Sequence, residues 1–371
     1  YEVEATDQAG NRGSATVTGL TVDTRPTRVF VTAGATGLSP NGDGTAERIE
    51  FSMYVNLTDG ADSWRLDMVR DDDTVARRFR GTSVRGNFTQ TWNGRTEDGE
   101  LLEGTYAAVF TVFYEKGNEP TARTTEFNLD VSPPEVDITL DGLPFSPDND
   151  GLNDELRILL DVEDRSSIAS WEYRILDRND RPFTVFSGQG RPSDALIWDG
   201  RSATGDTVIS AEDYPYVLEV TDSLGNTATE RGLIPIDILV VRDGNRLKVQ
   251  IASITFEPNS PELVVDPATD QGQKNLRVLR RLVEVFDKYR DYDIRIEGHA
   301  VNITGTEREE REELQPLSLA RAQEVKDALV GLGMSERRIS VLGRGGTEPV
   351  VPHTDLEERW KNRRVEFILI R

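Results

Sequence analysis

The pattern of hydrophobic and polar residues changes once along this chain. Up to about residue 240, apolar and polar residues alternate in short runs, as at 49–55, 107–113 and 216–220. Alternation with a period of two is typical of strands with one buried face, and clusters of Gly, Asn and Asp bound each run. The pattern therefore predicts antiparallel β-sandwiches of about 100 residues each.

After residue 245 the period becomes helical. Five apolar residues recur at helical spacing between 275 and 286: Leu276, Leu279, Leu282, Val283 and Phe286. They predict an amphipathic helix whose apolar side faces a core. A strand is expected at 247–252 before this helix, and another at 291–297 after it.

A second helix is expected at 318–331. Ser318 is a suitable N-cap, and either Gly331 or Gly333 is a suitable C-cap. Strands at 339–342 and 364–370 complete the order strand, helix, strand, helix, strand, strand. The terminal part is therefore predicted to be an α+β domain with a mixed sheet and two main helices.

The first two thirds of the chain contains an internal repeat. Ser-Pro-Asn-Gly-Asp-Gly at 39–44 recurs as Ser-Pro-Asp-Asn-Asp-Gly at 146–151, and Trp92-Asn-Gly recurs as Trp198-Asp-Gly. The opening residues 1–11 align with 216–226. Prolines at 26 and 133–134 mark stiff connectors. The expected domains are listed here in order: the tail of a truncated repeat at 1–25, complete repeats at 26–133 and 134–241, and a terminal domain at 245–371.

Each repeat has a Ser-Pro-(Asn/Asp) start and a Trp-(Asn/Asp)-Gly turn, and the first repeat also has a Gly-x-Tyr step at 104–106. These motifs resemble the FlgD-type immunoglobulin-like repeat of bacterial envelope and surface proteins. The second copy departs from it, with Glu212-Asp-Tyr214 in place of Gly-x-Tyr. The resemblance implies tandem all-β immunoglobulin-like sandwiches.

Four motifs occur in order in the terminal part: Ile-Thr-Phe-Glu-Pro-Asn-Ser at 254–260, Ile-Glu-Gly-His-Ala at 296–300, Leu-Ser-Leu-Ala-Arg-Ala at 317–322 and Asn-Arg-Arg-Val-Glu-Phe at 362–367. Their identity and order resemble the OmpA-like peptidoglycan-associating domain. The resemblance implies a module that ties envelope proteins to the bacterial cell wall.

The recognition residues of that family are only partly present. The family's Asp, two residues after the His, binds the ammonium of the wall peptide's diaminopimelate, and here Val301 stands in its place. Arg321 fills the position of the Arg that binds the carboxylate. A family Asn before the Leu-Ser step aligns with Leu314. The resemblance therefore implies a pocket that has kept its cation and lost its acidic partner.

Other residues around the expected pocket are further candidates. Asn302, next to Val301, offers a neutral acceptor, and Arg363 aligns with a family Arg near the ligand. His299 aligns with a family His that packs at a strand end, so a metal or base role is not favoured. The loop before the second helix is longer than in the family and holds Glu-Arg-Glu-Glu-Arg-Glu-Glu at 307–313. This insertion either covers the pocket or supplies a replacement carboxylate.

Acidic loops in both repeats raise the alternative of a metal site. Asp43 and Glu47 in the first repeat, and Asp148, Asp150 and Asp154 in the second, place oxygen ligands at alternate positions as calcium loops do. The full twelve-residue calcium-loop pattern is missing, and Asp, Asn and Gly also form ordinary turns. The sequence predicts no cofactor and leaves a weak calcium site open.

Composition narrows the range of partners. The chain has 371 residues and a net charge of −23. From Val249 onward 19 basic residues nearly balance 22 acidic ones, so the excess of negative charge lies in the repeats. This charge disfavours nucleic acid and anionic lipid as partners. No apolar run is long enough to span a bilayer.

The sequence also disfavours an enzyme. The absence of cysteine excludes disulfides, cysteine-ligated zinc and thiol catalysis. No Gly-x-Ser-x-Gly turn or phosphate-binding loop is present, and no sequence pattern pairs two carboxylates in a cleft.

The sequence therefore predicts a non-catalytic structural protein of the bacterial envelope, periplasmic or associated with the outer membrane. Its partners would be peptidoglycan, bound weakly or in a changed mode, and other envelope proteins. The alternative is a protein-interaction scaffold whose terminal domain has lost peptidoglycan binding.

Overall fold

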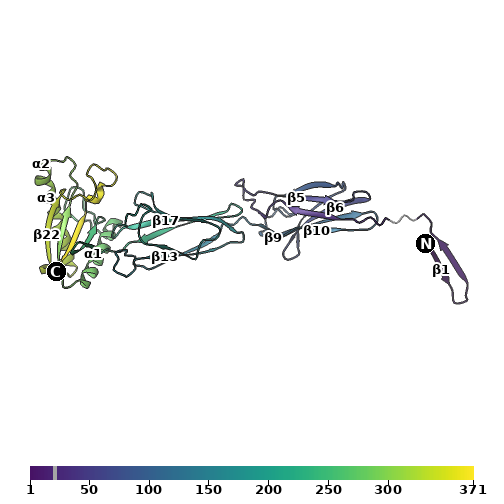
Figure 1. The fold of residues 1–371 in the computed structure, drawn as a ribbon, viewed down its shortest axis with the longest axis horizontal. Helices are drawn as coiled ribbons and strands as arrows, with labels where there is room; N and C mark the ends of the chain where they lie inside the picture. Colours follow the sequence, from purple (N-terminus) through teal and green to yellow (C-terminus); the bar gives the residue numbers. More distant parts are fainter. Residues whose placement is uncertain (20–22) are drawn as a thin grey trace. The chain divides into compact units, whose positions relative to one another are not determined.

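A computed structural model describes residues 1–19 and 23–371 of the chain (Figure 1). Residues 20–22, which fall within the predicted tail at 1–25, lie outside the described residues. The chain forms two compact units. Unit 1 contains Tyr1–Pro133 together with the short segments Asp164–Ser167 and Asp222–Asn226, and unit 2 contains the remainder. Among the described residues, no helix is both long and apolar enough to cross a membrane.

Unit 1 begins with a hairpin and continues with a two-sheet sandwich. The hairpin pairs β1 (Glu2–Thr6) with β2 (Arg12–Thr16). One sheet of the sandwich consists of β3 (Val29–Ala33), β5 (Ile49–Val55) and β8 (Asn87–Trp92). The other has the order β4 (Gly37–Leu38), β11 (Phe127–Leu129), β9 (Gly104–Tyr114), β6 (Ala61–Arg70) and β7 (Val75–Gly81), with β10 (Thr121–Arg123) also paired to β9. The alternation in β5 buries every second residue, as the sequence predicts.

Unit 2 begins with a second two-sheet sandwich. Its three-stranded sheet has the order β12 (Glu135–Asp141), β13 (Leu156–Glu163) and β16 (Ala195–Trp198). Its four-stranded sheet has the order β15 (Pro182–Gln189), β14 (Ile168–Leu176), β17 (Asp213–Asp222) and β18 (Thr227–Pro235).

The two sandwiches share the geometry of the repeated tryptophan turn. Trp92 and Trp198 are each 2% exposed, and their indole N–H groups donate to the carbonyl oxygens of Arg95 (2.8 Å) and Arg201 (2.9 Å). The glycine that follows has φ near +77° in both copies, a conformation that a residue with a side chain rarely adopts. The repeated sequence motif thus reflects one local structure formed twice.

The C-terminal part of unit 2 is a mixed sheet covered by helices. The strand order is β19 (Val241–Asp243), β20 (Arg246–Ile251), β23 (Val365–Ile370), β21 (Asp293–His299) and β22 (Ile339–Gly345). Only β21 and β22 run parallel. The helices are α1 (Asp270–Lys288), α2 (Glu307–Glu309), the π-helical turn η1 (Glu310–Leu314), α3 (Gln315–Gly331) and the 3-10 turns η2 (Glu336–Arg338) and η3 (Arg359–Asn362). Two sandwiches followed by an α+β domain confirm the predicted fold class.

Helix α1 buries a face slightly rotated from the predicted one. Leu279, Leu282 and Phe286 are buried as expected, but Val278 and Val285 complete the face. Leu276 and Val283 lie at its edges and are only partly buried. The 3.6-residue period is compatible with either set of buried residues, and packing against the sheet determines which set is buried.

The predicted N-cap at Ser318 is wrong. Ser318 is fully buried inside α3, where its hydroxyl donates to the Gln315 carbonyl (3.0 Å) and accepts from the Gly345 N–H (2.9 Å). The helical segment starts earlier, because the 307–313 insertion is itself helical and Thr306 caps it. At the other end Gly333 has φ +104°, as a C-terminal capping glycine requires.

Candidate functional site

A cavity of about 860 Å³ opens beside α3 in the C-terminal part. It is called here the Arg321 cavity. Its polar and charged lining includes His299, Glu309, Glu313, Arg321 and Arg363. Three of these five residues, His299, Arg321 and Arg363, are pocket candidates that the sequence predicts. Glu309 and Glu313 belong to the 307–313 insertion. The sequence predicts that this insertion either covers the pocket or supplies a replacement carboxylate.

A glycine lets α3 lie directly on the sheet next to this cavity. A Cβ atom at Gly298 would come within 2.0 Å of the Ser318 carbonyl oxygen, so no other residue fits there without moving the helix. The next residue, His299, donates its backbone N–H to the Arg364 carbonyl (3.0 Å), and Ala300 donates to the Gly345 carbonyl (2.7 Å). These bonds fix the strand end that carries Val301.

Arg321 reaches the cavity from α3 without a carboxylate partner. Its Nε donates to the Ser260 carbonyl (3.1 Å), and its guanidinium carbon lies 5.0 Å from the centre of the Phe256 ring. No ion pair joins it to any acidic residue of the described chain. Burial, with a contribution from the nearby charge of Arg363, lowers the pKa of Arg321. The cavity therefore contains a partly desolvated cation that forms no ion pair with a described carboxylate.

The two positions that lack the family's polar residue are apolar and buried. Val301 is 6% exposed and Leu314 is 8% exposed, and both line the Arg321 cavity. Neither side chain can accept a hydrogen bond. The lining of the cavity therefore combines cationic and aliphatic side chains.

A buried charge network lies behind the cavity. Glu366 is 3% exposed and pairs with Arg364 (2.6 Å) and Lys248 (2.7 Å). Burial alone would raise the pKa of Glu366, but His299, Arg364 and Lys248 outweigh it and hold this pKa below its usual range. His299 Nε2 lies 3.6 Å from a Glu366 carboxylate oxygen, and within the described residues neither ring nitrogen of His299 nor Nη1 of Arg364 has a hydrogen-bond partner. His299 is thus a buried residue of the strand end that lies beside Glu366.

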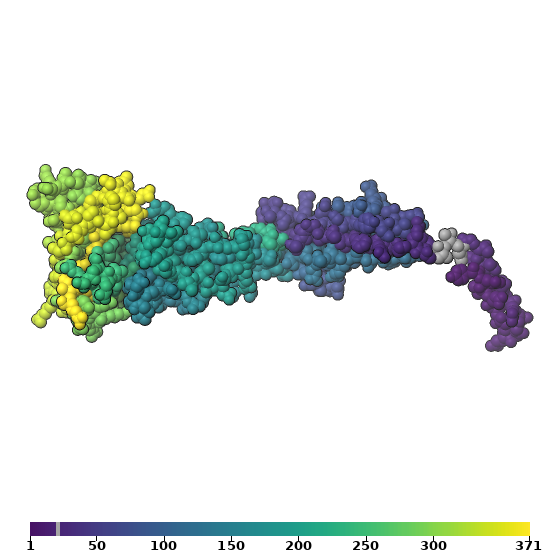
Figure 2. Space-filling view, in the orientation of Figure 1, coloured from purple at the N-terminus to yellow at the C-terminus, as the bar shows by residue number. Residues whose placement is uncertain are grey.

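The insertion is attached to the end of β22 and to the loop after β21. Glu310 accepts from the Gly346 N–H at 2.9 and 3.1 Å, and Glu309 accepts from the Thr304 N–H at 2.8 Å. The Asn302 side-chain oxygen accepts from the Gly305 N–H (2.7 Å), and Asn302 is not among the residues lining the cavity. In Figure 2 the insertion (light green) and the segment after β22 (yellow) are adjacent on the surface of unit 2.

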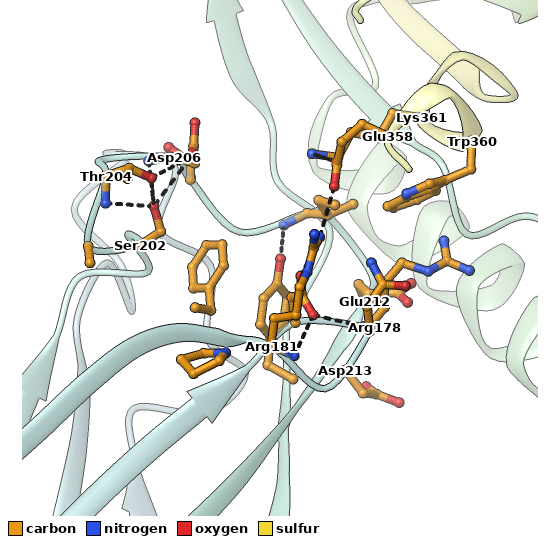
Figure 3. Close-up of a pocket in the computed structure, with 18 residues that line it drawn as sticks. Arg178, Arg181, Ser202, Thr204, Asp206, Glu212, Asp213, Glu358, Trp360 and Lys361 are labelled. Carbon is orange, nitrogen blue, oxygen red and sulfur yellow. Dashed lines mark hydrogen bonds and ion pairs between the residues drawn. The ribbon is translucent and has the colours of Figure 1, made fainter. Parts of the chain in front are cut away.

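A second cavity of unit 2, of about 460 Å³, has a different electrostatic character (Figure 3). It is called here the Arg181 cavity. Arg181 pairs with Asp177 (2.9 Å), Glu357 (2.8 Å) and Glu358 (3.1 Å). Arg178 stacks on the Trp360 ring, with its guanidinium carbon 3.9 Å from the ring centre. Arg181 is thus paired with carboxylates, whereas Arg321 forms no ion pair among the described residues.

The acidic loop of the second repeat brings its three aspartates together. Oxygens of Asp148, Asp150 and Asp154 lie within 4.8 Å of one another. Backbone groups also bind this loop: Asp154 accepts from the Asn149 N–H (2.6 Å), and Asp148 accepts from the Val240 N–H (2.9 Å). Burial raises the pKa of Asp148. The residues fit the oxygen chemistry of calcium, and they equally form a closed turn.

The corresponding loop of the first repeat is held by hydrogen bonds alone. Glu47 accepts from the Gly42 N–H (2.7 Å) and Asp43 accepts from the Thr45 N–H (2.6 Å). The Thr45 N–H lowers the pKa of Asp43. Among the described residues, Asp43 and Glu47 do not form a group of three possible metal ligands with another acidic side chain.

Unit 1 contains an acidic cluster that sequence reasoning missed. Oxygens of Asp130, Asp164 and Asp222 lie within 4.8 Å of one another, and Asp130 and Asp222 are 2% and 1% exposed. Burial, together with the charges of Asp130 and Asp222, raises the pKa of Asp164 to about 6. These aspartates come from three segments far apart in the sequence, so no local pattern could have grouped them.

One sequence signal did point to part of this cluster. The Thr-Asp-x-x-Gly-Asn motif occurs at 6–11 and at 221–226. In both copies the Asp accepts from its Asn at 2.8 Å, as Asp7 does from Asn11 and Asp222 from Asn226. In the second copy, Asn226 also accepts from the Ser39 hydroxyl (2.7 Å). The motif therefore forms a turn, and in the second copy the Asn side chain also makes a contact outside this turn.

Fold and site together define a modular protein with tandem β-sandwiches and a terminal α+β domain. The model of the OmpA family matches residues 255–363, so this part of the chain is an OmpA family domain. The match includes Val301, Leu314, Arg321 and Arg363. It confirms the resemblance for the terminal domain, while the FlgD-type resemblance of the repeats stays a prediction. The search of curated proteins found no match.

Solved structures similar to the chain align with about a third of it. A putative MotB-like protein from Desulfovibrio vulgaris is 27% identical over 36% of this chain and 77% of that chain, with a TM-score of 0.30. The cell wall anchor of the T6SS from Pseudomonas aeruginosa is 28% identical over 36% and 87%, with a TM-score of 0.29. The peptidoglycan-associated lipoprotein from Burkholderia pseudomallei is 23% identical over 31% and 85%, with a TM-score of 0.25.

Proposed function

We propose that this protein is a non-catalytic component of the bacterial cell envelope that contacts peptidoglycan through its OmpA family domain. The repeats, which resemble FlgD-type sandwiches, act as a spacer and as a surface for other envelope proteins. The proposed location is the periplasm or the periplasmic side of the outer membrane. Calcium binding at the Asp148 loop is an additional proposal that the wall contact does not require.

The observation that carries the proposal is the unpaired Arg321 in the cavity of a domain matched to the OmpA family. A cation that is partly removed from water loses hydration energy, and an intramolecular carboxylate would normally restore it. Because Arg321 has no such partner, a ligand carboxylate would complete its interactions. Guanidinium and carboxylate groups also form paired, charge-assisted hydrogen bonds.

The test is cosedimentation of the full chain with purified sacculi. The parent protein should sediment with the sacculi, and Arg321→Ala should reduce binding at least tenfold, which corresponds to about 1.4 kcal/mol. Arg337→Ala, at an exposed arginine of η2, is the matched control and should bind like the parent. Binding by Arg321→Ala equal to that of the parent would place the contact elsewhere.

A protein-interaction scaffold is the second candidate, and Val301 is the observation that favours it. The family's acidic residue is replaced by a buried aliphatic one, so part of the wall-binding chemistry is missing. This candidate predicts that neither the parent nor Arg321→Ala sediments with sacculi. Cosedimentation of the parent alone separates the two functions.

A further inference from the structure

We propose that the Arg321 cavity selects a carboxylate carried on an aliphatic stem and does not recognise a cationic group on the ligand. This inference rests on the proposed contact with peptidoglycan and specifies which chemical group of the wall peptide is bound. It assigns a specificity that differs from recognition of a zwitterion, in which an ammonium and a carboxylate are both paired.

The two arginines Arg321 and Arg363 in the lining of the cavity favour an anion. No ion pair joins either of them to a carboxylate of the described residues. The charge of Arg363 contributes to lowering the pKa of Arg321, so the two positive charges interact unfavourably. A ligand carboxylate between them would remove this repulsion and replace lost hydration.

The aliphatic part of the lining would oppose a cation. Val301 and Leu314 belong to it, and Ile254 and Leu317 add further aliphatic side chains. An ammonium placed against these side chains would lose water and gain no acceptor from them, which is unfavourable. Methylene or methyl groups would instead gain from burial.

The carboxylates near the cavity do not replace the missing acceptor. Glu309 is already bound by the Thr304 side-chain hydroxyl and by the N–H groups of Ile303 and Thr304. Glu313 and Glu257 line the cavity but have exposed side chains, where solvent and salt screen their charge. The insertion therefore adds negative charge near the cavity without adding a buried partner for an ammonium.

Chemical modification of sacculi separates the two kinds of recognition. Acetylation of free amines with acetic anhydride removes the ammonium groups, and amidation of carboxyls with a carbodiimide and ammonia removes the carboxylates. The full chain should bind acetylated sacculi within about twofold of unmodified sacculi, and it should lose at least tenfold in binding to amidated sacculi.

A variant pair tests the role of position 301. Val301→Asp supplies an acceptor, so it should bind unmodified sacculi more tightly than acetylated sacculi. Val301→Ala, which changes size without adding charge, should stay indifferent to acetylation. If acetylation abolishes binding by the parent, the inference is overturned, although the proposed contact with peptidoglycan stands.

A measurement without sacculi tests the inference independently of the proposed function. Butyrate and butylammonium are titrated separately into the full chain while the arginine side-chain N–H resonances are followed by NMR. Butyrate should shift an Nε–H signal that disappears in Arg321→Lys, and butylammonium should not shift it. A shift of this signal by butylammonium, or none by butyrate, overturns the inference even if sacculi are bound.

Discussion

The stability of unit 1 should fall as the pH rises through the titration of Asp164, and Asp164→Asn should remove this dependence. Asp164 lies beside the buried carboxylates of Asp130 and Asp222. One of its oxygens accepts from the Ser166 N–H (2.6 Å). An asparagine keeps that acceptor and has no charge, so the substitution isolates the electrostatic cost.

The size of the effect follows from the pKa. Asp164 has a pKa of about 6 in the folded chain, against an ordinary value of 3.8. Between these values the folded state holds a proton that the unfolded state has lost, so rising pH destabilises the fold. The difference corresponds to at most about 3 kcal/mol, and solvent screening at this partly exposed carboxyl reduces it to about 1–2 kcal/mol. The penalty is fully present above pH 6 and absent below about pH 4.

Differential scanning calorimetry of the full chain, in buffers containing EDTA, measures this difference. At pH 7.5 Asp164→Asn should melt roughly 3–8 °C above the parent in the transition of unit 1, and near pH 4 the two should coincide. The control Asp161→Asn changes an exposed aspartate of β13 and should show no such pH-dependent gain. An Asp164→Asn advantage of equal size at both pH values would show that the charge is not responsible.

Three further predictions concern other parts of the chain. Millimolar calcium should raise the melting temperature of the parent by mass action and should not do so in Asp150→Ala; an unmoved parent would show that the loop is only a turn. Residues 135–240 expressed alone should melt cooperatively with a β-type circular dichroism spectrum, and a non-cooperative melt would contradict an independent repeat. Gly298→Ala should destabilise the terminal domain by about 3 kcal/mol or more, because its Cβ would meet the Ser318 carbonyl oxygen at 2.0 Å; a denaturation midpoint equal to that of the parent would refute this.

The fold was largely predictable because its determinants are local and periodic. Alternation in β5 predicts the buried face of that strand without further information. The start of α3 was predicted less well, since Ser318 is a good N-cap by type but sits inside a longer helical segment. Whether a serine caps a helix depends on what precedes it, and here an unusual insertion continues the helix in the N-terminal direction.

The identity of the candidate site's residues could be predicted from the sequence, but the orientation of their side chains could not. The motif order placed Arg321 and Val301 in one pocket, and both line the same cavity. The direction of the Asn302 side chain could not be predicted, because its oxygen accepts from the Gly305 N–H in the loop after β21. The cluster around Asp164 was also inaccessible, since its members are distant in sequence and meet only through tertiary packing.

The insertion shows why acidic residues near a cavity do not by themselves define what the cavity binds. Its run at 307–313 contains five glutamates, which suggests a replacement for the family's lost carboxylate. Two of them are used on backbone N–H groups instead, Glu309 at Thr304 and Glu310 at Gly346. A carboxylate bound in this way stabilises the loop and has less capacity left for a ligand. The loss of the acceptor at Val301 is therefore not compensated by the negative charge added beside it, and Arg321 remains without an ion-pair partner among the described residues.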